Sequence, residues 1–180
     1  MLKCCVESMT EIDPTNKMGK TFIWIAWIFA LALLVFFFQD VLDKQWDPNK
    51  DPQISLNTQG KAEVKLRQNR QGHYVVHGEI NEIPVVFLLD TGATQVSIPA
   101  HVAERLQLKG YGKSRVNTAN GSITVYPTKL QQLSIGNVYL YDVSAHINPS
   151  MQSDQILLGM SALKRVEFSQ IGKQLILREQ

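Results

Sequence analysis

The residues whose types and spacing could do chemistry lie at the end of one apolar run. Residues 84–89 read PVVFLL and are followed directly by Asp90-Thr91-Gly92. A continuous apolar run bounded by turn residues is typical of a strand buried on both faces. A carboxylate at the end of such a strand is held in place, as a general acid or base requires. Asp and Gly also favour turns, so an ordinary turn is the alternative interpretation.

Two further segments must be placed around that carboxylate. Ile156-Leu157-Leu158-Gly159 lies near the C-terminus and precedes a short helical stretch at 160–164. Alone, it is typical of a core strand that ends in a glycine turn. Between the two motifs, Asn120-Gly121 separates strand-like runs at 114–118 and 122–126, which predicts a hairpin.

The order of these three elements resembles the retropepsin-like family of aspartic proteases, and most closely its bacterial, single-pass, membrane-anchored members. The resemblance covers about residues 72–177. It implies a mainly β protomer, a closed barrel of the acid-protease type with one or two short helices. It also implies hydrolysis of peptide bonds without a metal or another cofactor.

The resemblance implies a role for each motif residue. Asp90 would be the catalytic carboxylate, Thr91 would bond across a dimer interface, and Gly92 would let the backbone approach the substrate. Three further groups complete the expected site. Ala93 and Thr94 would support the loop, and the flap over the peptide would comprise Thr118, Ala119, Asn120 and Gly121. The hydrophobic-hydrophobic-Gly element beneath the loop would be Leu157, Leu158 and Gly159.

One aspartate implies two chains. As is known for aspartic proteases generally, two adjacent carboxylates share one proton, because both cannot ionise at close range. The chain has no second Asp-Thr/Ser-Gly, and Asp142 and Asp154 stand in different sequence contexts. We therefore expect a homodimer with Asp90 from each chain at the axis. A protein or peptide substrate would bind as an extended strand between flap and floor.

Residues 22–38 form an unbroken apolar run without charge, glycine or proline. This length is sufficient for a transmembrane helix that contacts membrane lipid. A cleaved signal peptide is the alternative, but no small-residue cleavage site follows the run. The positive-inside rule predicts a cytoplasmic tail at 1–21 and an extracytoplasmic protease domain, periplasmic in a Gram-negative cell. The lysines behind this prediction are Lys3, Lys17 and Lys20 before the run, against Lys44 and Lys50 after it.

Beyond the apolar run, residues 39–59 are polar and predict a juxtamembrane linker, and residues 60–180 predict the protease domain. Asn81-Glu82 separates two strand patterns and predicts a hairpin. Pro99 is a natural first residue for a short helix. The predicted strands are 62–67, 73–80, 83–89, 114–118, 122–126, 130–135, 138–147 and 174–177, and the predicted helices are 99–106 and a short one after Gly159.

Other functions find little support. A net charge of +2 without a basic stripe argues against nucleic-acid binding. His73 and His77 have zinc-site spacing only on a helix, and they lie in a predicted strand, so no metal site is predicted. His101 and His146 are isolated. Cys4-Cys5 is too close to the terminus for a disulfide framework, which leaves palmitoylation as an open alternative.

The sequence thus predicts a membrane-anchored aspartic endopeptidase. Two alternatives stay open: a catalytically inactive peptide-binding or scaffold module of the same fold, and an enzyme that releases its own domain by cutting within 46–59. The intact Asp90-Thr91-Gly92 favours an enzyme, because a binding module does not require a carboxylate at that strand end.

Overall fold

The computed structural model describes residues 14–57, 59–118 and 121–180, with the side chains of 14–21 and 40–44 outside that description. The chain divides after Leu42 into two compact units. The boundary therefore lies inside the segment that the sequence predicts as a linker.

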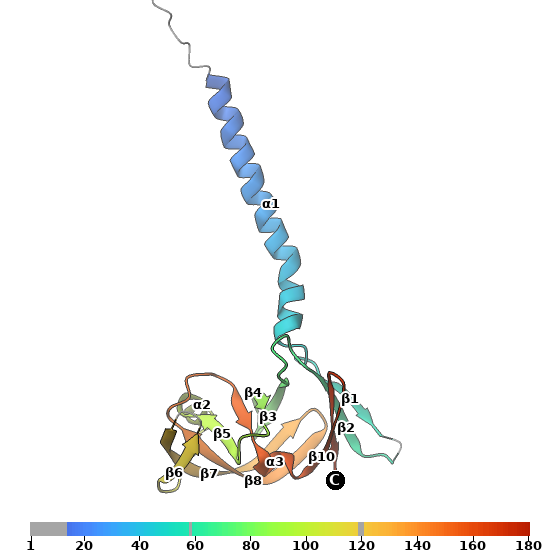
Figure 1. Cartoon of the computed structure of the whole chain (residues 1–180), viewed down its shortest axis with the longest axis vertical. Helices are drawn as coiled ribbons and strands as arrows, with labels where there is room; N and C mark the ends of the chain where they lie inside the picture. The colour runs from blue at the N-terminus through green and yellow to red at the C-terminus, as the bar shows by residue number, and fades with distance from the viewer. Residues whose placement is uncertain (1–13, 58, 119–120) are drawn as a thin grey trace, which may run out of the picture. The chain divides into compact units, whose positions relative to one another are not determined.

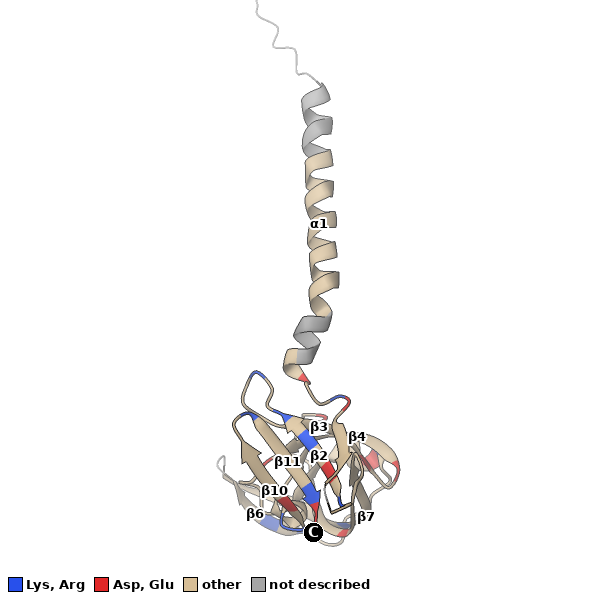
Figure 2. Cartoon of the chain, turned by 90° about the vertical axis from the view of Figure 1, so that its right-hand side faces the viewer, with Lys and Arg blue, Asp and Glu red and all other residues tan. Residues whose placement is uncertain are grey.

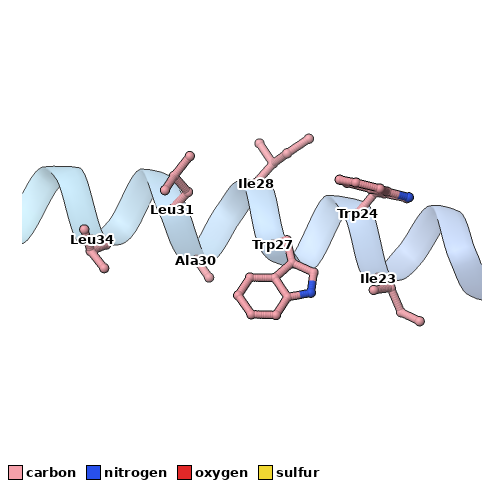
Figure 3. A pocket seen from close by; sticks show the side chains of 7 residues that line it. All are labelled: Ile23, Trp24, Trp27, Ile28, Ala30, Leu31 and Leu34. Atoms are coloured by element: carbon pink, nitrogen blue, oxygen red, sulfur yellow. The ribbon is translucent and has the colours of Figure 1, made fainter.

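The apolar run lies in helix α1 (Pro14–Trp46). Its window Phe22–Gln39 has a mean hydropathy of 2.4, and none of it is buried. Apolar side chains project from opposite sides of the helix (Figure 3), and the seven labelled residues all belong to α1 itself. This helix is long and apolar enough to cross a membrane, although a signal sequence near an N-terminus has the same properties.

The second unit contains two sheets (Figure 1). The smaller is antiparallel, in the order β1-β2-β11-β10. The larger has the order β3-β4-β9-β5-β8-β7-β6, and β3 also pairs with β7. That extra pairing closes every strand of the larger sheet except β6 into a barrel, which confirms the predicted closed, mainly β fold. The strands are β1 (Gln53–Leu56), β2 (Ala62–Arg67), β3 (Val75–Ile80), β4 (Ile83–Leu89), β5 (Val96–Pro99), β6 (Ser114–Thr118), β7 (Gly121–Ile135), β8 (Val138–Asn148), β9 (Ile156–Leu158), β10 (Val166–Ile171) and β11 (Gln174–Glu179).

The hairpin between β3 and β4 is confirmed, and its geometry explains its sequence. Asn81 and Glu82 have φ angles of 49° and 67°. Two consecutive positive φ angles are typical of the type I′ turn, whose twist suits paired strands and in which Asn is favoured. The Asn81 side chain also accepts a hydrogen bond from the Gln132 amide on β7 (3.1 Å), so the turn is joined to the barrel.

Strand β4 corrects one expectation. Val85 and Phe87 are buried, whereas Val86, Leu88 and Leu89 are only half-buried. The run is therefore not buried on both faces. In a closed barrel, alternate side chains point inward and outward, so only one face of a strand reaches the core.

Strand β7 corrects a second expectation, because the predicted strands 122–126 and 130–135 are parts of one strand that passes through Pro127. The pairing of β6 with β7 ends at Val125, so Pro127 pairs with β8 alone. A proline lacks a donor for one neighbour, and it is tolerated where a strand is paired on one side.

The segment predicted as a linker contributes to the domain. α1 continues to Trp46, and β1 pairs with β2. Between them, the buried Asn49 side chain donates to the carbonyl oxygens of Arg67 (2.8 Å) and Val75 (2.6 Å) and accepts from the Arg67 amide (2.6 Å). Asn49 therefore joins the end of β2 to the start of β3.

Two short helices match the predicted positions. α2 (Ala100–Arg105) begins directly after Pro99, and α3 (Met160–Leu163) begins directly after Gly159. Acidic and basic residues both occur in the four-stranded sheet (Figure 2), where Glu63 on β2 contacts Arg178 on β11.

Candidate active site

Asp90 follows the last residue of β4, and the backbone of its own loop orients its carboxylate. The Gly92 amide donates to Asp90 Oδ1 (2.9 Å), and the Ala93 amide donates to the Asp90 carbonyl (3.2 Å). The Asp90 amide donates to the Leu158 carbonyl on β9 (3.2 Å). The carboxylate is half-exposed, so it is held in position and remains accessible to a substrate.

The hydrophobic-hydrophobic-Gly element lies beneath this loop. Leu158 pairs with Leu89 in the parallel register of β9 and β4. At the start of α3, the Met160 amide donates to the Ala93 carbonyl (2.8 Å) and the Ser161 amide donates to the Thr94 carbonyl (3.0 Å). The first amides of a helix have no partner within the helix. Here the loop carbonyls are their acceptors, which ties the loop to α3.

The Ser161 side chain adds a second connection. Its hydroxyl donates to the Ser144 carbonyl on β8 (2.7 Å) and accepts from the Val96 amide at the start of β5 (3.1 Å). The loop that carries Asp90 is thus bounded on both sides by hydrogen-bonded structure.

A groove of about 650 Å³ opens beside Asp90. One wall is the β6–β7 hairpin, which contributes Val116, Ile123 and Val125. The floor comes from the Asp90 loop and the strands β5, β8 and β9. The complete lining is Asp90, Gly92, Ala93, Thr94, Gln95, Ser97, Ser114, Val116, Asn117, Thr118, Ile123, Val125, Pro127, His146, Asn148 and Leu157.

The hairpin lies at the position expected of a flap. Thr118 pairs with Gly121, and the Thr118 hydroxyl donates to the Gly121 carbonyl (2.8 Å). Gly121 has a φ angle of 110°, which a glycine adopts readily. Ala119 and Asn120, which the sequence also assigns to the flap, lie outside the described residues.

The structure gathers most of the predicted site residues around one groove. Asp90, Gly92, Ala93, Thr94, Thr118 and Leu157 line it. Leu158 and Gly159 are buried beneath the loop, and Thr91 is exposed beside it.

Six polar residues of the groove were not predicted as site residues: Gln95, Ser97, Ser114, Asn117, His146 and Asn148. The alternation of side chains along a strand could have indicated that Gln95 and Ser97 face the site, because side chains two residues apart share a strand face. His146 appears isolated in the sequence, and only the pairing of β5 with β8 brings it to Ser97. Burial lowers the pKa of the His146 imidazole.

Among the described residues, no cluster of three or more His, Cys, Asp or Glu side chains could hold a metal ion. His77 instead contacts Asp47, with 2.5 Å between Nε2 and Oδ2. The arrangement around Asp90 offers a positioned carboxylate at a groove that has the β6–β7 hairpin as one wall.

Comparison with known proteins agrees with this geometry. The family model of the gag-polyprotein putative aspartyl protease matches residues 76–165, half of the chain. An uncharacterized protein in the cobV 5′ region of Sinorhizobium sp. is 31% identical over 121 residues, which are 66% of this chain and 52% of that protein. An uncharacterized protein of Rickettsia prowazekii is 26% identical over 122 residues, 64% of this chain and 51% of that protein. The chain spans about half the length of these curated relatives.

A solved structure shares the fold. The crystal structure of a retropepsin-like aspartic protease from Rickettsia conorii superimposes with a TM-score of 0.58 and 26% identity, over 72% of this chain and 96% of that chain. The family model spans the strand before Asp90, the loop, the hairpin and the Leu157-Leu158-Gly159 element. The chain therefore belongs to the retropepsin-like aspartic protease family.

Proposed function

We propose that the chain is a membrane-anchored aspartic endopeptidase whose active site is completed by two copies of Asp90, one from each protomer of a homodimer. The observation that carries this proposal is that Asp90 is the only carboxylic acid among the sixteen residues that line the groove. A site with one positioned carboxylate has half of the pair that this chemistry needs.

The chemistry explains why two carboxylates are required. One carboxylate takes a proton from a water molecule, whose oxygen adds to the scissile carbonyl carbon. The other, which is protonated, donates a hydrogen bond to the carbonyl oxygen. The C–N bond then breaks, and the leaving nitrogen takes up a proton. Because the proton belongs to the pair, one isolated Asp90 cannot supply both functions.

The groove suits an extended peptide. Main-chain hydrogen bonds to strand edges provide affinity, and pockets for alternate side chains provide selectivity. The hairpin of β6 and β7 forms a wall of the groove beside the substrate path, as a flap does. Thr91 is exposed next to Asp90, where it is free to bond with the same loop of a second protomer.

Helix α1 supports the membrane part of the proposal. An apolar window of this length spans the hydrocarbon core of a bilayer. We infer a cytoplasmic N-terminus and an extracytoplasmic protease domain. Anchoring two chains in one bilayer raises their effective concentration, which favours the dimer.

The test compares the full chain, purified in detergent, with its Asp90→Asn variant on a mixed peptide library at several pH values. We expect cleavage by the wild type and none by Asp90→Asn. Asp142→Asn is the matched control, because Asp142 is an exposed carboxylate outside the groove. Equal cleavage by wild type and Asp90→Asn contradicts the proposal. No cleavage by a dimeric wild type also contradicts it and favours an inactive peptide-binding module.

A further inference from the structure

A row of side chains crosses the groove floor away from Asp90. Ser97 on β5 pairs with His146 on β8 and with Leu157 on β9, and His146 pairs with Pro127 on β7. Directly paired residues on neighbouring strands point to the same face of a sheet. All four line the groove, so the centre of this floor is polar and its two ends are apolar.

Asn148 extends the polar part of the row. It lies two residues after His146, on the same face of β8. Ser97 and Asn148 are both buried, at 4% and 8% exposure, and Asn148 Nδ2 is 3.5 Å from Ser97 Oγ. The Asn148 amide oxygen is already used, because it accepts from the Ser150 amide (3.0 Å). The amide nitrogen has the weaker contact and keeps the capacity to donate to a ligand.

His146 completes the polar group. Among the described residues, the one hydrogen bond of its side chain joins Nδ1 to Gln95 Oε1 at 3.5 Å, which is long for a hydrogen bond. Asp90 is the only other titratable residue in the lining. Because burial lowers the pKa of His146, the imidazole is neutral at pH 7, with one nitrogen that donates and one that accepts.

The position of His146 gives it a role in selectivity rather than in bond cleavage. Strands β9 and β5 lie between β4, which carries Asp90, and β8. Around the barrel wall, three strand intervals correspond to a path of roughly 14 Å. The imidazole therefore meets a substrate side chain away from the scissile bond.

We propose that His146, Ser97 and Asn148 form a specificity subsite that selects a substrate glutamine or glutamate over an aliphatic residue of similar length. The side-chain oxygen of such a residue accepts from Asn148 Nδ2, while His146 supplies the partner for the other polar atom of the substrate side chain. The Ser97 hydroxyl donates to Met151 Sδ (3.2 Å), a weak acceptor, so Ser97 donates to the substrate only by turning away from that contact. An aliphatic side chain there would displace water from buried polar groups without replacing the hydrogen bonds that the water makes, and this loss weakens binding. This inference rests on the proposed function, because it assumes that the groove binds a peptide.

The test measures binding separately from cleavage. The full-length Asp90→Asn chain in detergent is titrated with fluorescent octapeptides that carry Gln, Glu, Leu or Met at one position at a time. At one position we expect Gln or Glu to bind about tenfold more tightly than Leu, the effect of one or two hydrogen bonds. Adding His146→Leu should abolish or reverse this preference. His146→Gln, which keeps a polar side chain, should retain part of it, and the exposed His73→Leu should leave it unchanged.

Three results overturn the subsite: a preference that persists in His146→Leu, tighter binding of aliphatic residues at every position, or no binding of any peptide. Its failure is distinguishable from failure of the proposed function. Asp90-dependent cleavage without a His146-dependent preference overturns the subsite alone. A His146-dependent binding preference without Asp90-dependent cleavage supports the subsite and contradicts the peptidase.

Discussion

Gly159 passes so close to Gln95 that a Cβ atom at Gly159 would lie 2.3 Å from the Gln95 carbonyl oxygen. The same Cβ would lie 2.7 Å from the Ala93 carbonyl oxygen. Both contacts are with backbone atoms of the active-site loop, so neither can be relieved by a side-chain rotation. The loop that carries Asp90 can take this position only because residue 159 is a glycine and has no side chain.

We therefore predict that Gly159→Ala displaces the active-site loop. Overpacking at such a site costs about 1–3 kcal/mol of unfolding free energy. We expect that loss in chemical denaturation, together with a larger loss of peptidase activity than the reduced stability explains. Gly172→Asn is the control, because a Cβ there meets nothing within 4 Å and Asn tolerates the positive φ of 60°. Wild-type activity and stability in Gly159→Ala would contradict this account.

Asn49 provides a second prediction, outside the groove. Its side chain makes three hydrogen bonds with the backbone of β2 and β3. Asn49→Ala leaves those backbone groups without partners, and we expect a loss of about 3 kcal/mol in denaturant unfolding. Asn69→Ala is matched to it, because the Asn69 side chain also bonds to the backbone, where its oxygen accepts from two amides in exposed hydrogen bonds. Equal losses in the two variants would mean that burial of Asn49 adds nothing.

The same contacts bear on the boundaries of a soluble form. A chain that starts at Asp43 keeps residues 47–49, whereas one that starts at Ile54 lacks Asn49 and its three bonds. We predict a lower thermal unfolding temperature for the shorter chain in a melting experiment. Equal melting temperatures would show that residues 43–53 are dispensable. These bonds also argue against self-cleavage next to Asn49, since a protease needs an extended, accessible segment.

The parts of the fold that could be predicted from sequence depend on local patterns. The hairpin at Asn81-Glu82, the helix after Pro99 and the strand that ends directly before Asp90 each follow from residues adjacent in the chain. The Leu157-Leu158-Gly159 element was recognised for the same reason, since its glycine and its apolar pair are contiguous. Family resemblance then supplied the arrangement of these parts.

The parts that were not predicted depend on pairing between distant segments. Asn49 is 26 residues from Val75, and no local pattern indicates that an amide in a polar stretch is buried. His146 joins the groove only because β8 runs parallel to β5, and it is 49 residues after its partner Ser97 in the chain. Closure of the barrel through β3 and β7 likewise depends on register.

Glu63 gives a prediction for acid stability. It is 6% exposed, and Arg178 Nε donates to its Oε2 (2.6 Å), while Lys65 Nζ lies 3.3 Å from its Oε1. The bond from Arg178, with a smaller contribution from Lys65, lowers the Glu63 pKa below its usual value, although burial opposes this effect. Because the Glu63 pKa is lower in the folded state than in the unfolded state, the ionised carboxylate stabilises the fold at pH values above the unfolded-state pKa. This contribution is lost as the pH falls through the folded-state pKa.

We therefore expect Glu63→Gln to lower the unfolding free energy at pH 7, with the difference from wild type shrinking as the pH falls below about 4. Denaturant titrations at a series of pH values measure this difference. The control is Asp142→Asn, because Asp142 has an exposed ion pair with Lys129, and exposed pairs contribute little. A difference between Glu63→Gln and wild type that does not depend on pH would contradict the role of the Glu63 charge.

The final prediction concerns the number of chains in the active site. If each site needs Asp90 from two protomers, a chain that carries Asp90→Asn inactivates every dimer it enters, because one ionisable carboxylate cannot form the pair. Wild type and Asp90→Asn chains are mixed in detergent in equal amounts and reconstituted together at constant total protein. Random pairing leaves about one quarter of the wild-type activity, whereas a site within one chain leaves about one half. Adding Asp142→Asn chains instead should leave the activity unchanged, since their Asp90 is intact. A linear loss with the fraction of Asp90→Asn would show that one chain completes its own site.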